Sequence, residues 1–151
     1  MLNREGYPLS PSLFDGVYAV VQAMSIAGEI PKSYFIVDTW TFTTSTATPT
    51  GNDTVRTNNA NMSLATAVYI TSMCNGSKDY KEMLDNLKPG HLIRIQDENL
   101  ATNYARYTIS GMPVRIGAVG ANGAYYTIPV TLAEFGAGVA NNQQSAVSFR
   151  S

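Results

Sequence analysis

The segments Val114-Arg-Ile-Gly-Ala-Val119 and Ala124-Tyr-Tyr-Thr-Ile-Pro-Val-Thr131 decide the fold class, because they flank the dipeptide Asn122-Gly123. Both segments are rich in β-branched and aromatic residues, which favour strands. Asn-Gly tolerates the positive φ angles of tight hairpin turns. We therefore predict a β-hairpin here, with the glycine-bearing stretch 117–123 as its tip.

Short segments of the same character recur from residue 33 onward. Trp40 and Phe42 alternate with threonines in the first of them, and Trp40 in mid-strand is expected in the core. We predict strands over 33–44, 54–58, 65–72, 91–96, 105–110, 114–119, 124–131 and 146–149. Regular short strands with turn signals indicate a mainly β fold, and we expect an antiparallel β-sandwich of about eight strands.

Two segments have the 3.6-residue period of helices instead. In the first, Ser10 suits an N-cap, Pro11 the first helical turn, and Gly28 the end. The apolar face of this N-terminal helix includes Leu13, Phe14, Val17, Tyr18, Val21 and Met24. Because almost no charge lies on any side, we expect it to be covered, either by its own domain or by another subunit. A shorter helix is predicted over 79–87, inserted between strands.

Composition limits the possible classes of protein. The chain has 151 residues, a net charge of −1 and only 14% charged residues. We expect an N-terminal anchoring segment, 1–31, and a β-sandwich domain, 32–151. There is no basic footprint for nucleic acid and no apolar run of the length that a membrane span needs. The single cysteine, Cys74, suggests folding in a reducing cytoplasm and is expected to be a buried thiol.

The residues that carry enzyme chemistry are sparse. The one histidine, His91, opens a strand, and no Gly-x-Ser-x-Gly motif or metal-ligand spacing occurs. We predict no catalytic residue, no metal site and no cofactor, and expect the protein not to be an enzyme. Paired carboxylates in an acidic cleft, as in a small glycoside hydrolase, remain the enzymatic alternative.

The order of several motifs resembles a domain found in phage fibre and particle-surface proteins. These are Trp40-Thr-Phe-Thr-Thr-Ser-Thr46, Val55-Arg-Thr-Asn-Asn-Ala60, Ala67-Val-Tyr-Ile-Thr71, Gly90-His-Leu-Ile-Arg-Ile-Gln96, Tyr107-Thr-Ile-Ser-Gly111, Gly123-Ala-Tyr-Tyr-Thr-Ile-Pro-Val-Thr131 and Ala146-Val-Ser-Phe149. The resemblance covers residues 34–149, although this sequence has no collagen-like or coiled-coil shaft. It implies a β-sandwich, self-association, commonly as trimers, and a structural or attachment role without catalysis.

Two positions in a bacteriophage particle are then expected. The first is a capsid decoration or cement protein, docked on the major capsid protein by residues 1–31. The alternative is a tail, baseplate or short-fibre component with an adaptor or host-attachment role. Surface tyrosines, with Tyr104, Tyr125 and Tyr126 as the candidates, would serve lateral packing or contact a host glycan.

Overall fold

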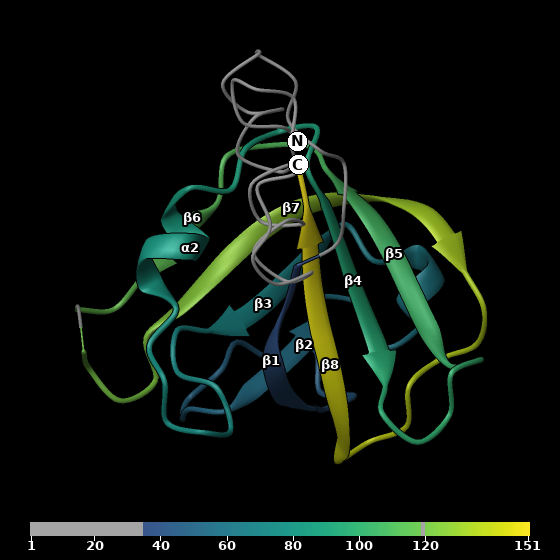
Figure 1. Cartoon of the computed structure of the whole chain (residues 1–151), viewed down its shortest axis with the longest axis horizontal. Coiled ribbons are helices and arrows are strands. Elements are labelled where there is room, and N and C mark those ends of the chain that lie inside the picture. The colour runs from purple at the N-terminus through teal and green to yellow at the C-terminus, as the bar shows by residue number, and fades with distance from the viewer. Residues whose placement is uncertain (1–34, 119) are drawn as a thin grey trace, which may run out of the picture. The chain divides into compact units, whose positions relative to one another are not determined.

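The computed structural model describes residues 35–118 and 120–151, which form the mainly β domain in Figure 1. The strands are β1 (Phe35–Phe42), β2 (Thr54–Thr57), β3 (Ala67–Thr71), β4 (Leu92–Asp97), β5 (Tyr104–Ile109), β6 (Val114–Ile116), β7 (Tyr125–Phe135) and β8 (Gln143–Arg150). A 3₁₀ turn, η1 (Met62–Leu64), precedes β3, and one short helix, α2 (Lys81–Asp85), precedes β4.

The sheet closes into a barrel, so the prediction of a two-sheet sandwich is wrong. Around the barrel the strand order is β1-β8-β4-β5-β7-β3-β2, and β2 returns to β1. The pairing of β1 with β2 is parallel, and the other pairings are antiparallel. Closure depends on β7, whose first half pairs with β3 and whose second half pairs with β5. A single long strand thus joins what would otherwise be two sheets, and closure leaves these seven strands without open edges.

The interior is filled by large side chains from alternate positions of the strands. Along β4 and β5 every second residue is buried, as expected when one face of a strand lines a core. The largest fully buried side chains are Trp40, Tyr107, Tyr126 and Phe42. Trp40 donates its indole N–H to the Thr71 carbonyl oxygen at 3.0 Å, and the Tyr107 hydroxyl donates to the Met62 carbonyl oxygen at 2.8 Å. The aromatic residues therefore fill the barrel without leaving these polar atoms unpaired.

The predicted positions of the strands are confirmed, with shifts at their ends. The inserted helix is shorter than predicted, Lys81–Asp85, and Cys74 is a buried free thiol. The predicted N-terminal helix lies outside the described residues. Among residues 35–118 and 120–151, no helix is long and apolar enough to cross a membrane.

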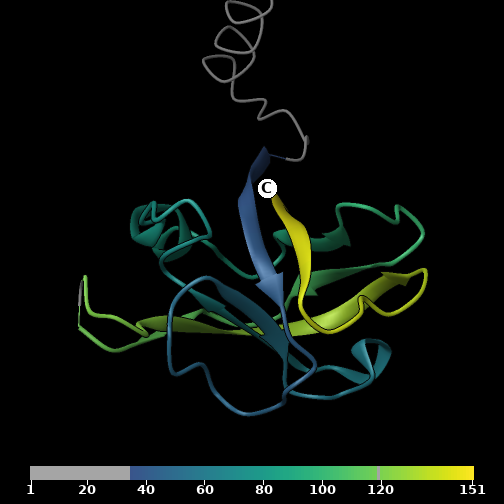
Figure 2. The same cartoon turned by 90° about the horizontal axis from the view of Figure 1, so that it is seen from below.

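The β6–β7 hairpin extends beyond the barrel. Its strands pair from Val114 with Thr127 to Ile116 with Tyr125, and its tip projects in both views (Figures 1 and 2). Gly117 and Gly123 have φ angles of 98° and 84°, which L side chains rarely adopt. The prediction of a hairpin with a glycine-bearing tip is thus confirmed.

We predict that Gly136→Ala destabilises the barrel whereas Gly138→Ala does not. A Cβ atom on Gly136 would lie 2.4 Å from the Thr102 carbonyl oxygen, but one on Gly138 would meet nothing within 4 Å. The strain at residue 136 should lower the free energy of unfolding by about 1–3 kcal/mol. Urea unfolding of both variants measures the difference, and equal midpoints would contradict the close approach of the two segments.

Candidate interaction surfaces

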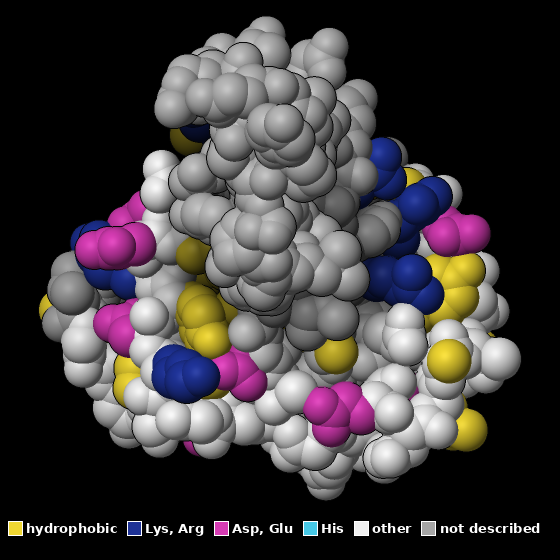
Figure 3. Space-filling view, in the orientation of Figure 1, with side chains coloured by type: hydrophobic (Ala, Val, Ile, Leu, Met, Phe, Trp, Pro, Cys, Tyr) yellow, Lys and Arg dark blue, Asp and Glu magenta, His cyan; other side chains and the backbone are white. Residues whose placement is uncertain are grey.

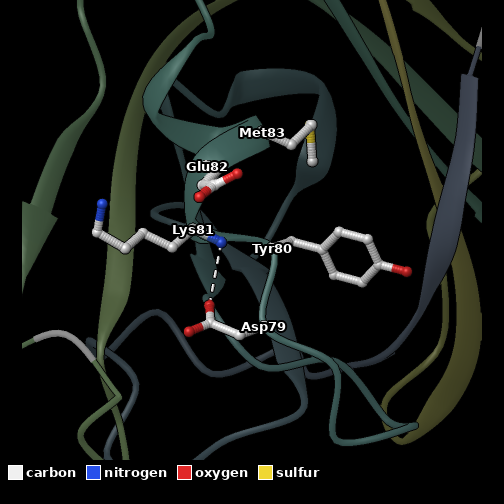
Figure 4. Close-up of a pocket in the computed structure, with 5 residues that line it drawn as sticks. All are labelled: Asp79, Tyr80, Lys81, Glu82 and Met83. Carbon is white, nitrogen blue, oxygen red and sulfur yellow. Dashed lines mark hydrogen bonds between the residues drawn. The ribbon is translucent and has the colours of Figure 1, made fainter.

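A hollow beside α2 is the candidate for a small-molecule pocket. It measures about 520 Å³ and is lined by Asp79, Tyr80, Lys81, Glu82 and Met83 (Figure 4). All five residues come from one stretch of chain, and the Asp79 carboxylate accepts a hydrogen bond from the Lys81 amide at 3.0 Å. A ligand site usually gathers polar groups from several elements around an enclosed space. The geometry of this hollow therefore fits a surface depression better than a catalytic cleft.

Tyr80 lines this hollow, and its ring points toward β1, as Figure 4 shows. Its hydroxyl donates to the Asp38 carboxylate at 2.8 Å, and the Thr39 amide donates to the same carboxylate at 2.8 Å. These hydrogen bonds, first that of Thr39 and then that of Tyr80, hold the pKa of Asp38 below the ordinary 3.8. Burial, aided by Asp38, raises the pKa of Tyr80 to about 12. The hydrogen bond between Tyr80 and Asp38 thus links the segment before α2 to β1 of the barrel.

We expect the hydrogen bonds to Asp38 to make the free energy of unfolding decrease at acid pH. The pKa of Asp38 is lower in the folded protein than in the unfolded chain, so its charge stabilises the fold at pH above 3.8. This contribution disappears as the pH falls through the folded-state pKa. The urea midpoints of the wild type and Asp38→Asn should therefore differ at pH 7 and converge toward pH 2. A difference that stays constant over this range would contradict the prediction.

Tyr126, one of the three candidate surface tyrosines, is instead part of the core. It is 1% exposed, and its hydroxyl donates to the Asp85 carboxylate at 2.6 Å. Hydrogen bonds from Lys81 and Tyr126 lower the pKa of Asp85. Tyr126 thus ties α2 to the barrel and does not belong to the surface.

Tyr125 points the other way and helps to form an apolar surface on the hairpin. Its ring meets that of Tyr69 edge-on, with centroids 6.1 Å apart. Ile116 is the cross-strand partner of Tyr125, and Val114 occupies the same face of β6. Ile116 and Val114 are 44% and 55% exposed, and Met112, just before β6, is 59% exposed. We call these five residues, Tyr69, Met112, Val114, Ile116 and Tyr125, the arm surface.

Tyr104 lies on a different part of the barrel, on β5. The Arg94 guanidinium stands 4.4 Å from the centre of its ring, a cation–π contact. The structure therefore does not bring Tyr104 and Tyr125 together into one aromatic platform. The candidate anchoring residues Leu13, Phe14, Val17, Tyr18, Val21 and Met24 lie outside the described residues.

Among the described residues, the groups considered for chemistry have separate structural contacts. The His91 side chain accepts a hydrogen bond from the Lys88 amide at 3.2 Å, and Cys74 is buried. Asp97 is 1% exposed and accepts bonds from the Asn99 and Leu100 amides at 2.8 and 3.3 Å, so it forms a turn inside the β4–β5 hairpin. Within 35–118 and 120–151, no three His, Cys, Asp or Glu residues are grouped so that they could hold a metal ion.

Residue patterns did not reveal the arm surface in advance. The strand over 114–119 was predicted, but whether Val114 and Ile116 face the core or solvent depends on whether another layer covers β6. The alternation Val114-Arg115-Ile116 indicates that the two apolar residues share a face, but it does not indicate whether that face is covered. Such a group on a sheet edge is typical of a protein contact.

Comparison of the chain with protein-family models, with curated proteins and with solved structures finds no match.

Proposed function

We propose that this chain is a non-enzymatic structural protein of a bacteriophage particle. On this proposal it is a capsid decoration or cement protein, which binds the major capsid protein through residues 1–31. The order of motifs between residues 34 and 149 supports the phage assignment by its resemblance to particle-surface domains. The observation that carries the structural role is the arm surface, an apolar and aromatic group formed by β6, the strand outside the barrel, together with Tyr125 on β7 and Tyr69 on β3.

Self-association through the arm surface is part of this proposal. Exposed apolar side chains beside an open strand edge are a liability for a protein that works alone, but they suit contacts between subunits. The resemblance favours a homotrimer. Contacts of this kind depend little on charge, in keeping with the low charged fraction of 14%.

The alternative place in the particle is the tail or baseplate, with an adaptor or host-attachment role. Tyr125 supports it, because an aromatic ring that is only half-buried and held edge-on against Tyr69 could contact a host glycan. The number of copies of this chain in each particle would distinguish a tail position from a position on the capsid lattice.

The N-terminal segment should supply the docking contact. We expect the full-length variants Val17→Asp and Val21→Asp to lose binding to particles that lack the protein, because a charge in an apolar contact costs desolvation. Co-sedimentation of added protein with such particles measures binding. Lys32→Gln, outside the predicted apolar face, is the control. Normal sedimentation of both Asp variants with the particles would contradict anchoring by this face.

A further inference from the structure

The sequence contains two Asn-Gly dipeptides, Asn75-Gly76 and Asn122-Gly123, and the structure restrains them differently. An asparagine before a glycine can react with its own backbone, because glycine has no Cβ atom to keep its nitrogen away from the asparagine side chain. The two sites share this local chemistry. They therefore form an internal comparison, in which the surrounding structure decides whether the reaction occurs.

The side chain of Asn75 is held in a network on the outer face of the barrel. Its Nδ2 atom donates to Gln144 Oε1, and its Oδ1 atom accepts a hydrogen bond from the Thr41 hydroxyl at 3.3 Å. The Asn75 backbone amide donates to the Thr39 carbonyl oxygen at 3.0 Å. The Cγ atom of Asn75 can therefore turn toward the Gly76 nitrogen only after its side-chain hydrogen bonds break.

Asn122 and Gly123 are the two central residues of a β-turn at the tip of the β6–β7 hairpin. The Ala124 amide closes this turn by donating to the Ala121 carbonyl oxygen at 3.2 Å. Asn122 is exposed, and no residue that the structure describes forms a hydrogen bond with its side chain. The tip of the hairpin lies at the left edge of the space-filling view in Figure 3. The side chain of Asn122 is thus free to turn toward the next peptide bond.

The amide of Gly123 is the restrained part of this site. It donates a hydrogen bond to Asn52 Oδ1 at 3.0 Å. A Cβ atom on Gly123 would lie only 3.0 Å from the Thr50 carbonyl oxygen, so the hairpin tip rests closely on the loop at 50–52. The hydrogen bond to Asn52 occupies the nitrogen that would attack Asn122. Hydrogen bonds of exposed loops open at a low cost in free energy, so this protection is incomplete.

We propose that Asn122 deamidates spontaneously and that the hydrogen bond between Gly123 and Asn52 sets the rate. When this bond opens, the Gly123 amide nitrogen gives its proton to solvent and attacks the Cγ atom of Asn122. A new C–N bond forms, the bond from Cγ to Nδ2 breaks, and Nδ2 takes up a proton and leaves as ammonia. Water then opens the cyclic imide at either carbonyl carbon, which leaves aspartate or isoaspartate at position 122.

The product differs from the original hairpin in charge and in backbone. A carboxylate appears on the hairpin that also carries Ile116 and Tyr125 of the arm surface. Isoaspartate in addition routes the backbone through the side chain, which lengthens the turn by one carbon atom. The reaction needs only water, so the inference is independent of the place of the chain in a particle.

The test follows both sites in the full-length protein at mildly alkaline pH, folded and in urea, by mass spectrometry of tryptic peptides. In the folded protein, Asn122 should convert about tenfold faster than Asn75, whose side-chain hydrogen bonds must break first. In urea the two rates should become similar, because only the Asn-Gly sequence then acts. Equal rates in the folded protein would overturn the proposal. So would an unchanged Asn122 in the folded protein under conditions that convert it in urea.

The variant Asn52→Ala tests the protecting hydrogen bond and should speed conversion of Asn122 about fivefold, the effect of one lost hydrogen bond. Asn59→Ala is the matched control. Asn59 likewise accepts one backbone amide, that of Asn61 at 2.9 Å, but lies beyond the other end of β2. Circular dichroism verifies that both variants are folded. An unchanged rate in Asn52→Ala, or an equal rise in both variants, would contradict control by Asn52.

Discussion

Replacing Trp40 with alanine should lower the free energy of unfolding by about 3–5 kcal/mol, the range for large aromatic residues in cores. Trp40 is fully buried on β1, and its ring contacts Tyr80 with centroids 5.6 Å apart. The change would leave a cavity and deprive the buried Thr71 carbonyl oxygen of its indole partner at 3.0 Å. Since small domains are stable by only about 5–15 kcal/mol, we expect a large part of the stability to be lost.

The variant Trp40→Phe separates the effect of the cavity from that of the lost hydrogen bond. It retains most of the aromatic volume but removes the N–H donor, so its loss should be smaller than that of the alanine variant. Because Trp40 is the one tryptophan in the sequence, unfolding in urea should be followed by far-ultraviolet circular dichroism. A loss below about 1 kcal/mol in the alanine variant would contradict the central position of Trp40, since surface changes have effects of that size.

Ile116→Asp should weaken self-association on the order of 100-fold, because it buries a charge in an apolar contact. Ile116 is 44% exposed at the centre of the arm surface and lies beside Tyr125. Its substitution should leave the stability of the barrel nearly unchanged, since β6 lies outside the closed ring of strands. Analytical ultracentrifugation over a range of concentrations measures the effect.

The control for this variant is Leu100→Asp. Leu100 is 54% exposed in the β4–β5 hairpin, away from β6, so the same change of chemistry there should not affect assembly. Equal weakening in both variants would indicate a general effect of the added charge. A wild-type protein that stays monomeric at all concentrations would contradict self-association through the arm surface.

Local patterns predicted the strands and the β6–β7 hairpin, but not how the other strands pair. The alternation in β4 and β5 follows from the two faces of a strand and can be seen in the sequence. The closure into a barrel depends on the pairing of β7 with both β3 and β5, and three of its five partner positions with β5 (Leu132, Glu134 and Phe135) lie beyond the predicted end at residue 131. A register shift between Arg106 and Tyr107 occurs where this extension pairs with β5. Period-two patterns do not specify either feature.

For the candidate surface residues too, alternation along a strand could be predicted, but not which side faces inward. Alternation required Tyr125 and Tyr126 to face opposite ways, and the structure places Tyr126 in the core and Tyr125 outside. Which of the two faced inward depended on the neighbouring strands. Arg94, Arg106 and Arg150 are distant in sequence, and only the registers of β8, β4 and β5 bring them to neighbouring positions on one face of the sheet.

The most direct test of the virion assignment is to quantify this chain against the major capsid protein in purified phage particles, by mass spectrometry. The proposed decoration role predicts hundreds of copies in each particle. A handful of copies, near a multiple of three or six, would move the protein to the tail or baseplate. Complete absence from the particles would contradict the structural role itself.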